Sequence, residues 1–218
     1  MFEDLAGIAP VRCIEGRNAS KADVLFYETN GVRVAVKTYG VRGFLIRHTL
    51  GRWLIFREAR AYEEAGEVNG LPAFLGRSGP FALATEWVDA EPLSSYRGVV
   101  LKTEIFDRLA GILDELHDRG VALGDLHHRD VLLNADGELY VIDLATAWVL
   151  GARPWPFRRF LFRRFCQSDR VSLARMRARF TGGDVEEAAI SVGEVAATWH
   201  RRGRKVKGWL DRLRGKRR

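Results

Sequence analysis

The sequence has little cysteine and no long apolar run. Its 218 residues include two cysteines, Cys13 and Cys166, which lie far apart and form no Cys-x-x-Cys pair. A disulfide framework or a zinc site therefore has no support, and a reducing compartment is expected. No apolar stretch approaches the roughly 18 residues of a membrane span. The N-terminus "MFEDLAGIAP" also lacks the pattern of a signal peptide, so we expect a cytoplasmic protein.

Acidic residues are fewer than basic ones, 28 against 35, which gives a formal net charge of +7. The excess is concentrated near the C-terminus, where residues 204–218 carry eight Lys and Arg against one Asp. Such a basic end favours an anionic partner, although a solvated tail is the alternative. The basic residues follow no helix-turn-helix or zinc pattern, so nucleic acid is not predicted as the partner.

Hydrophobic periodicity predicts strands first and helices later. Residues 22–40 contain two β-rich runs joined at Asn30-Gly31, which predicts a hairpin. The pattern predicts a helix over residues 50–65 and a strand within residues 81–93.

A second helix is predicted over residues 102–120, with Thr103 as its cap and Gly120 as its stop. The runs "VLLN" and "LYVID" around Asp136-Gly137 predict a second hairpin. Beyond Pro154 the pattern is mostly helical and increasingly basic.

Acidic residues recur in "GVALGDLHHRDVLLNADGELYVIDLATA", residues 120–147. Phosphoryl transfer needs carboxylates that hold metal ions and one that orients the attacking hydroxyl. Protein kinases place the catalytic Asp five residues before a metal-binding Asn, and a metal-binding Asp after the next hairpin. Counting from Asp130 of the "HRD" triplet leads to Ala135, which binds no metal. Counting from Asp125 leads to Asp130, with Asp143 18 residues on, so we favour Asp125.

The segment "GDLHHRDVLLNADGELYVIDLATA" resembles the catalytic-loop and metal-loop block of kinase-like phosphotransferases. It is closest in style to small bacterial members with "HGDLHxxN", such as aminoglycoside phosphotransferases, lipopolysaccharide-core sugar kinases and RIO-type kinases. The resemblance is strong over residues 120–147 and weaker over residues 20–95. It implies an α+β, two-lobed protein-kinase-like fold that uses ATP and Mg²⁺. We expect a small β-rich N-lobe at residues 1–89, a mainly helical C-lobe at residues 90–200 and a basic tail at residues 201–218.

By this resemblance, Asp125 is the catalytic base, and Asp130 and Asp143 are the Mg²⁺ ligands. "VRVAVKTYG" resembles the kinase "VAIK" strand, which makes Lys37 the candidate for the α/β-phosphates. Its helix partner would be Glu58 in "FREARAYEEA", with the neighbouring Glu63 and Glu64 less suited.

The segment "ATEWVDAEPL" resembles the hinge that binds adenine through backbone groups, which implicates Glu86 and Val88. Asp169 resembles the buried Asp that steadies the catalytic loop. The glycine-rich loop of the family is poor here, with only Gly16 and with Ser20 as a candidate phosphate contact. Asp169 follows Asp143 by 26 positions, too few for a long regulated activation loop.

Two further features admit more than one interpretation. We expect His127 to pack in its loop and His128 to face solvent or substrate. The aromatic residues of segment 155–165 are expected in the core. They alternate with arginines, so an amphipathic surface at a membrane interface is the alternative. The aromatic residues are Trp155, Phe157, Phe160, Phe162 and Phe165.

Together these features predict a kinase that moves the γ-phosphoryl of ATP to a hydroxyl. The basic aromatic segment favours a sugar of a membrane glycolipid, such as a lipopolysaccharide core, with peripheral contact between the C-terminal region and the inner membrane surface. A RIO-like serine/threonine protein kinase is one alternative. A nucleotide-binding pseudokinase without turnover is another, because the glycine-rich loop is poor and Asp130 replaces Asn.

Overall fold

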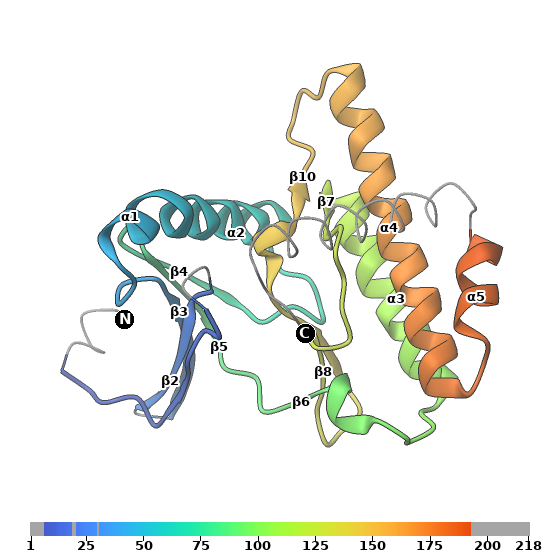
Figure 1. Ribbon diagram of the computed structural model, residues 1–218, viewed down its shortest axis with the longest axis horizontal. Helices are drawn as coiled ribbons and strands as arrows, with labels where there is room; N and C mark the ends of the chain where they lie inside the picture. Colours follow the sequence, from blue (N-terminus) through green and yellow to red (C-terminus); the bar gives the residue numbers. More distant parts are fainter. Residues whose placement is uncertain (1–6, 19–20, 30, 193–218) are drawn as a thin grey trace, which may run out of the picture.

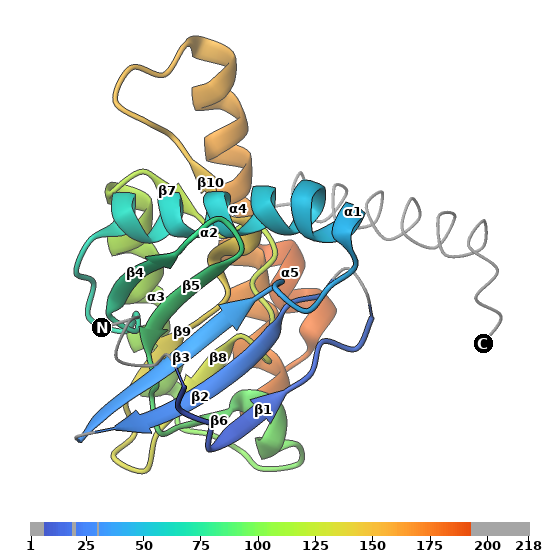
Figure 2. The same cartoon turned by 90° about the vertical axis from the view of Figure 1, so that its left-hand side faces the viewer.

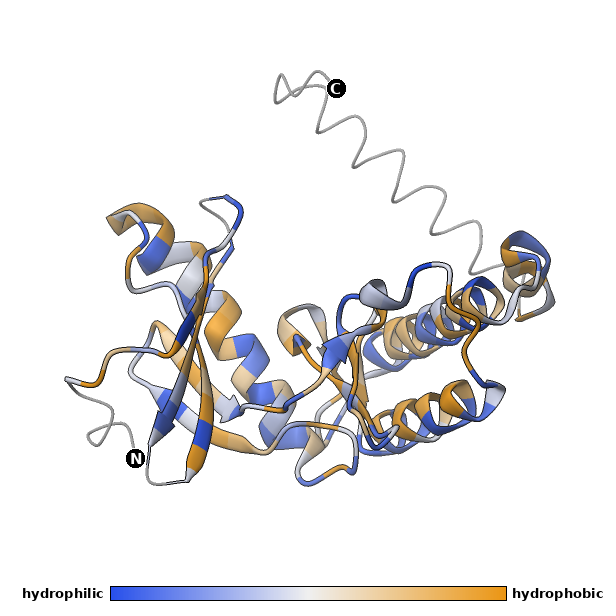
Figure 3. Cartoon of the chain, turned by 90° about the horizontal axis from the view of Figure 1, so that it is seen from below, coloured by the Kyte–Doolittle hydropathy of each residue, from blue (hydrophilic) through white to orange (hydrophobic). Residues whose placement is uncertain are grey.

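The structure, a computed structural model, describes residues 7–18, 21–29 and 31–192. A sheet with one long helix forms the first part of the molecule, and a mainly helical part follows (Figure 1). Seen from below, the sheet lies at one end and the paired long helices at the other (Figure 3). This arrangement confirms the expected α+β, two-lobed fold. The expectations for Ser20 and for residues 201–218 fall outside the described residues.

The first part is built on a five-stranded antiparallel sheet with the order β1-β2-β3-β5-β4 (Figure 2). Strands β2 and β3 pair along their whole length, which confirms the predicted hairpin. Alternation along β3 buries Val34 and Val36 on one face and directs Lys37 to the other. The strands are β1 (Arg12–Ile14), β2 (Asp23–Thr29), β3 (Val32–Thr38), β4 (Phe74–Ser78) and β5 (Ala82–Glu86).

A long helix packs against this sheet. It begins irregularly, with α1 (Phe44–Ile46) and a π-helical turn at Arg47–Gly51, and continues as α2 (Arg52–Ala65). Gly66 ends α2 with a positive φ of 61°. The predicted helix over residues 50–65 is therefore confirmed. Among the residues of α2, Glu58 is the one charged side chain that is buried.

The second part starts at residue 91 and contains the remaining elements. The predicted helix is present as α3, but its N-cap is Lys102 without a side-chain cap hydrogen bond, so the expected cap at Thr103 is wrong. Strands β8 and β9 form the second predicted hairpin. The elements are β6 (Glu91–Pro92), η2 (Leu93–Tyr96), α3 (Thr103–Asp118), β7 (Val121–Ala122), β8 (Val131–Leu133), β9 (Leu139–Val141), η3 (Leu144–Thr146), β10 (Trp148–Val149), α4 (Pro156–Thr181) and α5 (Val185–Val192).

The main core lies between α3, the second half of α4 and the β8–β9 hairpin. Polar and apolar residues are mixed along both long helices (Figure 3), and their apolar faces meet in this core. Apolar side chains there each lose their contact with water, which is worth about 1.5–3 kcal/mol apiece. The core residues include Phe106, Leu109, Leu113, Leu116, Val131, Val141, Met176 and Phe180.

The first half of α4 projects beyond the other described elements (Figures 1 and 2). Phe162 is buried, as expected, but Trp155, Phe157 and Phe160 are 63%, 52% and 51% exposed. The expectation that these three aromatic residues belong to the core is therefore wrong. The physical reason is that no other described element covers this end of the helix.

Candidate active site

Lys37 lies where the two parts of the molecule meet. Its Nζ is 2.7 Å from Oε2 of Glu58 on α2 and 2.7 Å from Oδ1 of Asp143, which follows β9. Burial opposes the charge of the ammonium, but the carboxylates of Glu58 and Asp143 outweigh it and raise the pKa of Lys37. The side chain is therefore a fixed positive charge that joins sheet, helix and loop.

Asp143 adopts a left-handed backbone, with φ 66° and ψ 68°. Among the described residues it is the one non-glycine residue with positive φ. Asp tolerates this region better than most side chains, and an outlier of this kind often marks a functional site. Burial raises the pKa of Asp143, but the charge and hydrogen bond of Lys37 outweigh that effect and hold it below its usual value.

The catalytic-loop candidate is anchored from behind by Asp169 on α4. This side chain is fully buried and accepts hydrogen bonds from Leu123 N at 2.8 Å and Gly124 N at 2.6 Å. Nε2 of His117 on α3 lies 2.9 Å from the same carboxylate. The expected steadying role of Asp169 is confirmed by these contacts.

Gly124 cannot be another residue at this point of the loop. Its φ is 77°, and a Cβ would lie 2.2 Å from Cδ1 of Phe165. The loop therefore passes close to α4, and the next residue, Asp125, is exposed. An exposed carboxylate at this position is accessible to a substrate hydroxyl.

Asp130 interacts with both other candidate carboxylates. Burial, followed by the charges of Asp143 and Asp125, raises the pKa of Asp130 to about 7. Mg²⁺ is commonly bound by one or two carboxylates together with phosphate oxygens and water, and Asp130 with Asp143 supplies such a donor set. In the described part of the chain no group of three or more His, Cys, Asp or Glu is arranged to hold a metal, so substrate phosphate would have to complete the coordination.

The hinge candidates lie at the end of β5. Glu86 N donates to Ala73 O at 2.8 Å, and its carboxylate accepts from Ala73 N at 3.3 Å, which fixes the start of the connection. Val88 follows and is half-buried, and within the described chain its N–H has no hydrogen-bond partner.

The burial of His128 contradicts the expectation that this side chain is exposed to solvent. Its side chain is 7% exposed, and its ring lies 4.0 Å from that of His127 and 6.2 Å from that of Phe180, measured between ring centroids. Burial, with the charges of neighbouring His and Arg residues, lowers the pKa of His128 to about 4. It is therefore a neutral packing residue under the loop and is not solvated.

Sequence reasoning missed the way in which the β1–β2 loop is held. Asp23, at the start of β2, accepts a hydrogen bond from Gly16 N at 2.7 Å and pairs with Arg42. A Cβ on Gly16 would lie 2.5 Å from Lys21 O, so the loop is folded tightly on itself. The charge of Lys21 acts on both Asp130 and Asp143. The lysine within this loop was the available sequence signal for this effect on the two carboxylates.

Arg57 was also missed, although it precedes Glu58. Its Nη2 donates to the backbone oxygens of Thr146 at 3.2 Å and Ala147 at 3.0 Å. These carbonyls follow Asp143 by three and four residues. Arg57 therefore ties the helix that carries Glu58 to the loop that carries Asp143.

Comparison with solved structures gives the same fold. No protein-family model matches the chain, and no curated protein matches its sequence. The kinase domain of Mycobacterium tuberculosis PknI is similar in structure, with a TM-score of 0.55 and 19% identity over 80% of this chain and 74% of that domain. A double mutant of that domain matches with a TM-score of 0.54 and 20% identity over 82% and 75%. The chain therefore has a protein kinase fold.

Proposed function

We propose that the chain is an ATP-dependent phosphotransferase that requires Mg²⁺ and acts on a hydroxyl group. The observation that carries the proposal is the bridge from Lys37 to both Glu58 and Asp143, at 2.7 Å each. Such a bridge fixes a cation beside two acidic loops in a protein-kinase fold. The domain limits at residues 89 and 200 are part of the same proposal.

In this proposal each side chain or backbone group of the site has one task. Lys37 holds the α/β-phosphates, Val88 N and the Glu86 backbone hold the adenine, and Asp125 orients the acceptor hydroxyl and takes its proton. The hydroxyl oxygen forms a bond to the γ-phosphorus as the bond from that phosphorus to the leaving oxygen breaks, which releases ADP. Asp130 and Asp143 would hold Mg²⁺, which neutralises the charge of the phosphates when bound.

We assign the acceptor to a sugar hydroxyl of a membrane glycolipid such as a lipopolysaccharide core. Two features support this choice over a protein acceptor. Only 12 residues lie between Asp143 and the start of α4 at Pro156, so the chain lacks the long segment on which a peptide could lie. The exposed arginines and aromatic residues of α4 follow this short segment directly in the sequence.

The test is transfer of label from γ-labelled ATP into fractionated extracts of the host that carries this sequence. We expect label in the lipid fraction, dependent on Mg²⁺, and its loss in Asp125→Asn with ATP binding retained. Asp136→Asn, in the β8–β9 turn, serves as the control and should be fully active. Label that enters none of the fractions under any metal would contradict the proposal.

A protein acceptor is the second candidate, because the similar solved structures are kinase domains of PknI. A RIO-like protein kinase belongs to this candidate, and the same experiment then places the label in the protein fraction. A nucleotide-binding pseudokinase would bind ATP without any transfer. Its motivation is the replacement of the usual Asn by Asp130, which adds a negative charge beside Asp143.

A further inference from the structure

The first half of α4 and the loop before it form an exposed tip. This arginine–aromatic tip comprises residues 153–164, and it projects beyond the rest of the described chain in both side views (Figures 1 and 2). Trp155 and Phe157 contact each other with ring centroids 5.4 Å apart, and neither is buried. Three large aromatic side chains exposed within six residues are unusual on a soluble surface and indicate an interaction site.

The tip is strongly basic. Residues 147–168 contain five arginines and no acidic residue. Arg164 lies over the ring of Phe160 at 5.1 Å, so cationic and aromatic groups alternate on the same helix. The five arginines are Arg153, Arg158, Arg159, Arg163 and Arg164.

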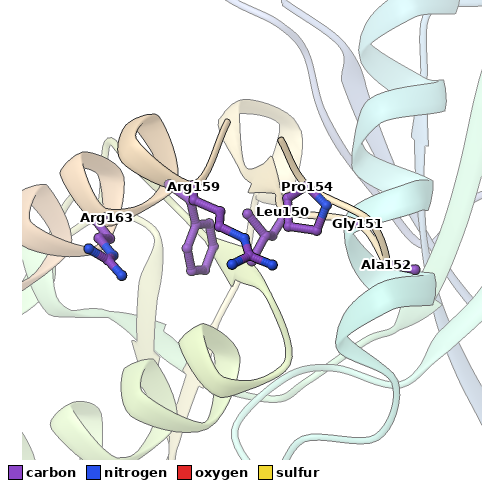
Figure 4. A pocket seen from close by; sticks show the side chains of 7 residues that line it. Leu150, Gly151, Ala152, Pro154, Arg159 and Arg163 are labelled. Atoms are coloured by element: carbon purple, nitrogen blue, oxygen red, sulfur yellow. The ribbon is translucent and has the colours of Figure 1, made fainter. Parts of the chain in front are cut away.

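Arg159 and Arg163 line a hollow of about 340 Å³ between the helix and the preceding loop. Figure 4 shows the guanidinium of Arg159 beside Leu150 and Pro154, with Arg163 one turn further along α4. Neither arginine has an ion-pair partner among the described residues. Two guanidinium groups at an apolar hollow suit a ligand with both anionic and apolar parts.

The basic surface continues onto α2. A second hollow is lined by Trp53, Phe56, Arg57 and Arg60 of α2 together with Arg158 of α4. Its α2 residues are again aromatic side chains and arginines. Glu58 of the same helix is buried and pairs with Lys37, and the remaining acidic residues of α2, Glu63 and Glu64, lie in its last turn. The tip and α2 therefore both present positive charge around the second hollow.

We propose that the arginine–aromatic tip docks onto the surface of a membrane rich in anionic phospholipid. Exposed aromatic side chains on a projecting helix insert between lipid headgroups, while arginines around them pair with lipid phosphates. A single-stranded nucleic acid would instead require a groove with stacking platforms, which a projecting tip does not provide. Within the described residues no helix is long and apolar enough to span a bilayer.

This docking goes beyond phosphoryl transfer and has its own readout. The tip is joined to the Asp143 loop by β10, so a docked tip would bring the whole enzyme to the membrane surface. Vesicle binding is measured without nucleotide, so an enzymatically inactive protein can still dock, and failure of docking is distinguishable from failure of the proposed activity.

The experiment is co-sedimentation of the full chain with vesicles of phosphatidylcholine alone or of an equimolar mixture with phosphatidylglycerol. We expect binding to the mixed vesicles only, weakened by salt. The variant Arg159→Glu/Arg163→Glu should lower the partition coefficient at least about ten-fold. The variant Trp155→Ala/Phe160→Ala should remove the binding that persists at high salt.

The matched control is Arg97→Glu/Arg179→Glu, which makes the same charge change on exposed residues away from the tip. It should bind mixed vesicles within about two-fold of the unaltered chain, because its charges do not face the membrane. Equal loss in both charge variants would indicate a diffuse effect of net charge and overturn the proposal. Binding that is unchanged in the Arg159 and Arg163 variant, or absent in the unaltered chain, would do the same. Thermal melting of each variant checks that it is folded.

Discussion

One ammonium group links the two parts of this molecule. Lys37 is the contact between the sheet, the buried carboxylate of Glu58 and the loop at Asp143. A phosphate that binds here adds negative charge beside the same lysine, so carboxylates and phosphate share one cation. Further positive charge near the phosphates would then be favourable, and the β1–β2 loop supplies it through Lys21.

We predict that Lys21 contributes to nucleotide binding in place of a glycine-rich loop. Its charge already acts on Asp130 and Asp143, and its side chain is exposed at the loop. Lys21→Ala should raise the KM for ATP about five-fold with little change in kcat, because an exposed charge contributes modestly to binding. Steady-state kinetics over a range of ATP concentrations measures both constants.

Two substitutions serve as controls for Lys21. Lys21→Arg keeps the charge and should retain the KM of the unaltered chain. Arg17→Ala removes a charge from the same loop and should leave the KM unchanged. If Arg17→Ala weakens ATP as much as Lys21→Ala, the effect belongs to the loop charge as a whole.

The roles of single residues differ in how well sequence anticipates them. The proximity of Asp130 to Asp125 and Asp143 could be predicted from the sequence, because all three residues lie in one short stretch of loop and hairpin. The burial of His128 and the exposure of Trp155 could not. Both depend on where α4 lies, and side-chain exposure at such positions is set by tertiary packing.

At the scale of elements, α4 supports the catalytic-loop candidate through one side chain. Asp169 accepts two backbone hydrogen bonds from the loop and contacts His117 on α3. Three elements therefore meet at one fully buried carboxylate. Removing it leaves buried N–H groups without an acceptor, which is more costly than the loss of an exposed pair.

We predict that Asp169→Ala lowers the free energy of unfolding by about 3 kcal/mol or more. Asp169→Asn keeps one acceptor oxygen and should cost less. Asp107→Ala, which removes an exposed ion pair with Arg177 between the same two helices at 3.0 Å, should cost under about 1 kcal/mol. Equilibrium denaturation in urea measures all three, and equal losses for Asp169 and Asp107 would refute the argument.

The segment between Asp143 and α4 leads to a prediction about regulation. Its only hydroxyl side chain between Asp143 and Pro156 is Thr146, whose Oγ1 donates to Leu123 O at 3.3 Å. A phosphate cannot order a long activation segment here, because none is present. Phosphatase treatment and the substitution Thr146→Ala should each leave the transfer rate within about two-fold of the untreated protein. A ten-fold or larger loss would show that phosphorylation does control the enzyme.

For the whole molecule, the fold class could be predicted because residues 120–147 resemble the catalytic block of kinase-like phosphotransferases, and local periodicity added the order of the strands, helices and hairpins. The contacts between distant segments could not be predicted this way. Arg57 reaches carbonyls about 90 positions along the chain, and Asp23 pairs with Arg42 through a loop whose path no periodicity describes. Such contacts arise from the packing of the two parts against each other.

The last prediction concerns the stability of both parts together. A ligand that binds between them stabilises the folded state by RT ln(1 + [L]/Kd), about 2.7 kcal/mol at one hundred times Kd. For a chain of this length that corresponds to a rise in Tm of roughly 5–10 °C. We expect Mg²⁺ with ATP to produce this rise in a thermal melt, and ATP with EDTA to produce a smaller one.

Asp143→Asn should abolish the difference in Tm between the two conditions, since Asn tolerates the left-handed backbone but lacks the charge. Asp130→Asn introduces the residue usual in kinases and should preserve it. A Tm that rises equally with and without Mg²⁺ in the unaltered chain would show that the carboxylates at 130 and 143 hold no metal.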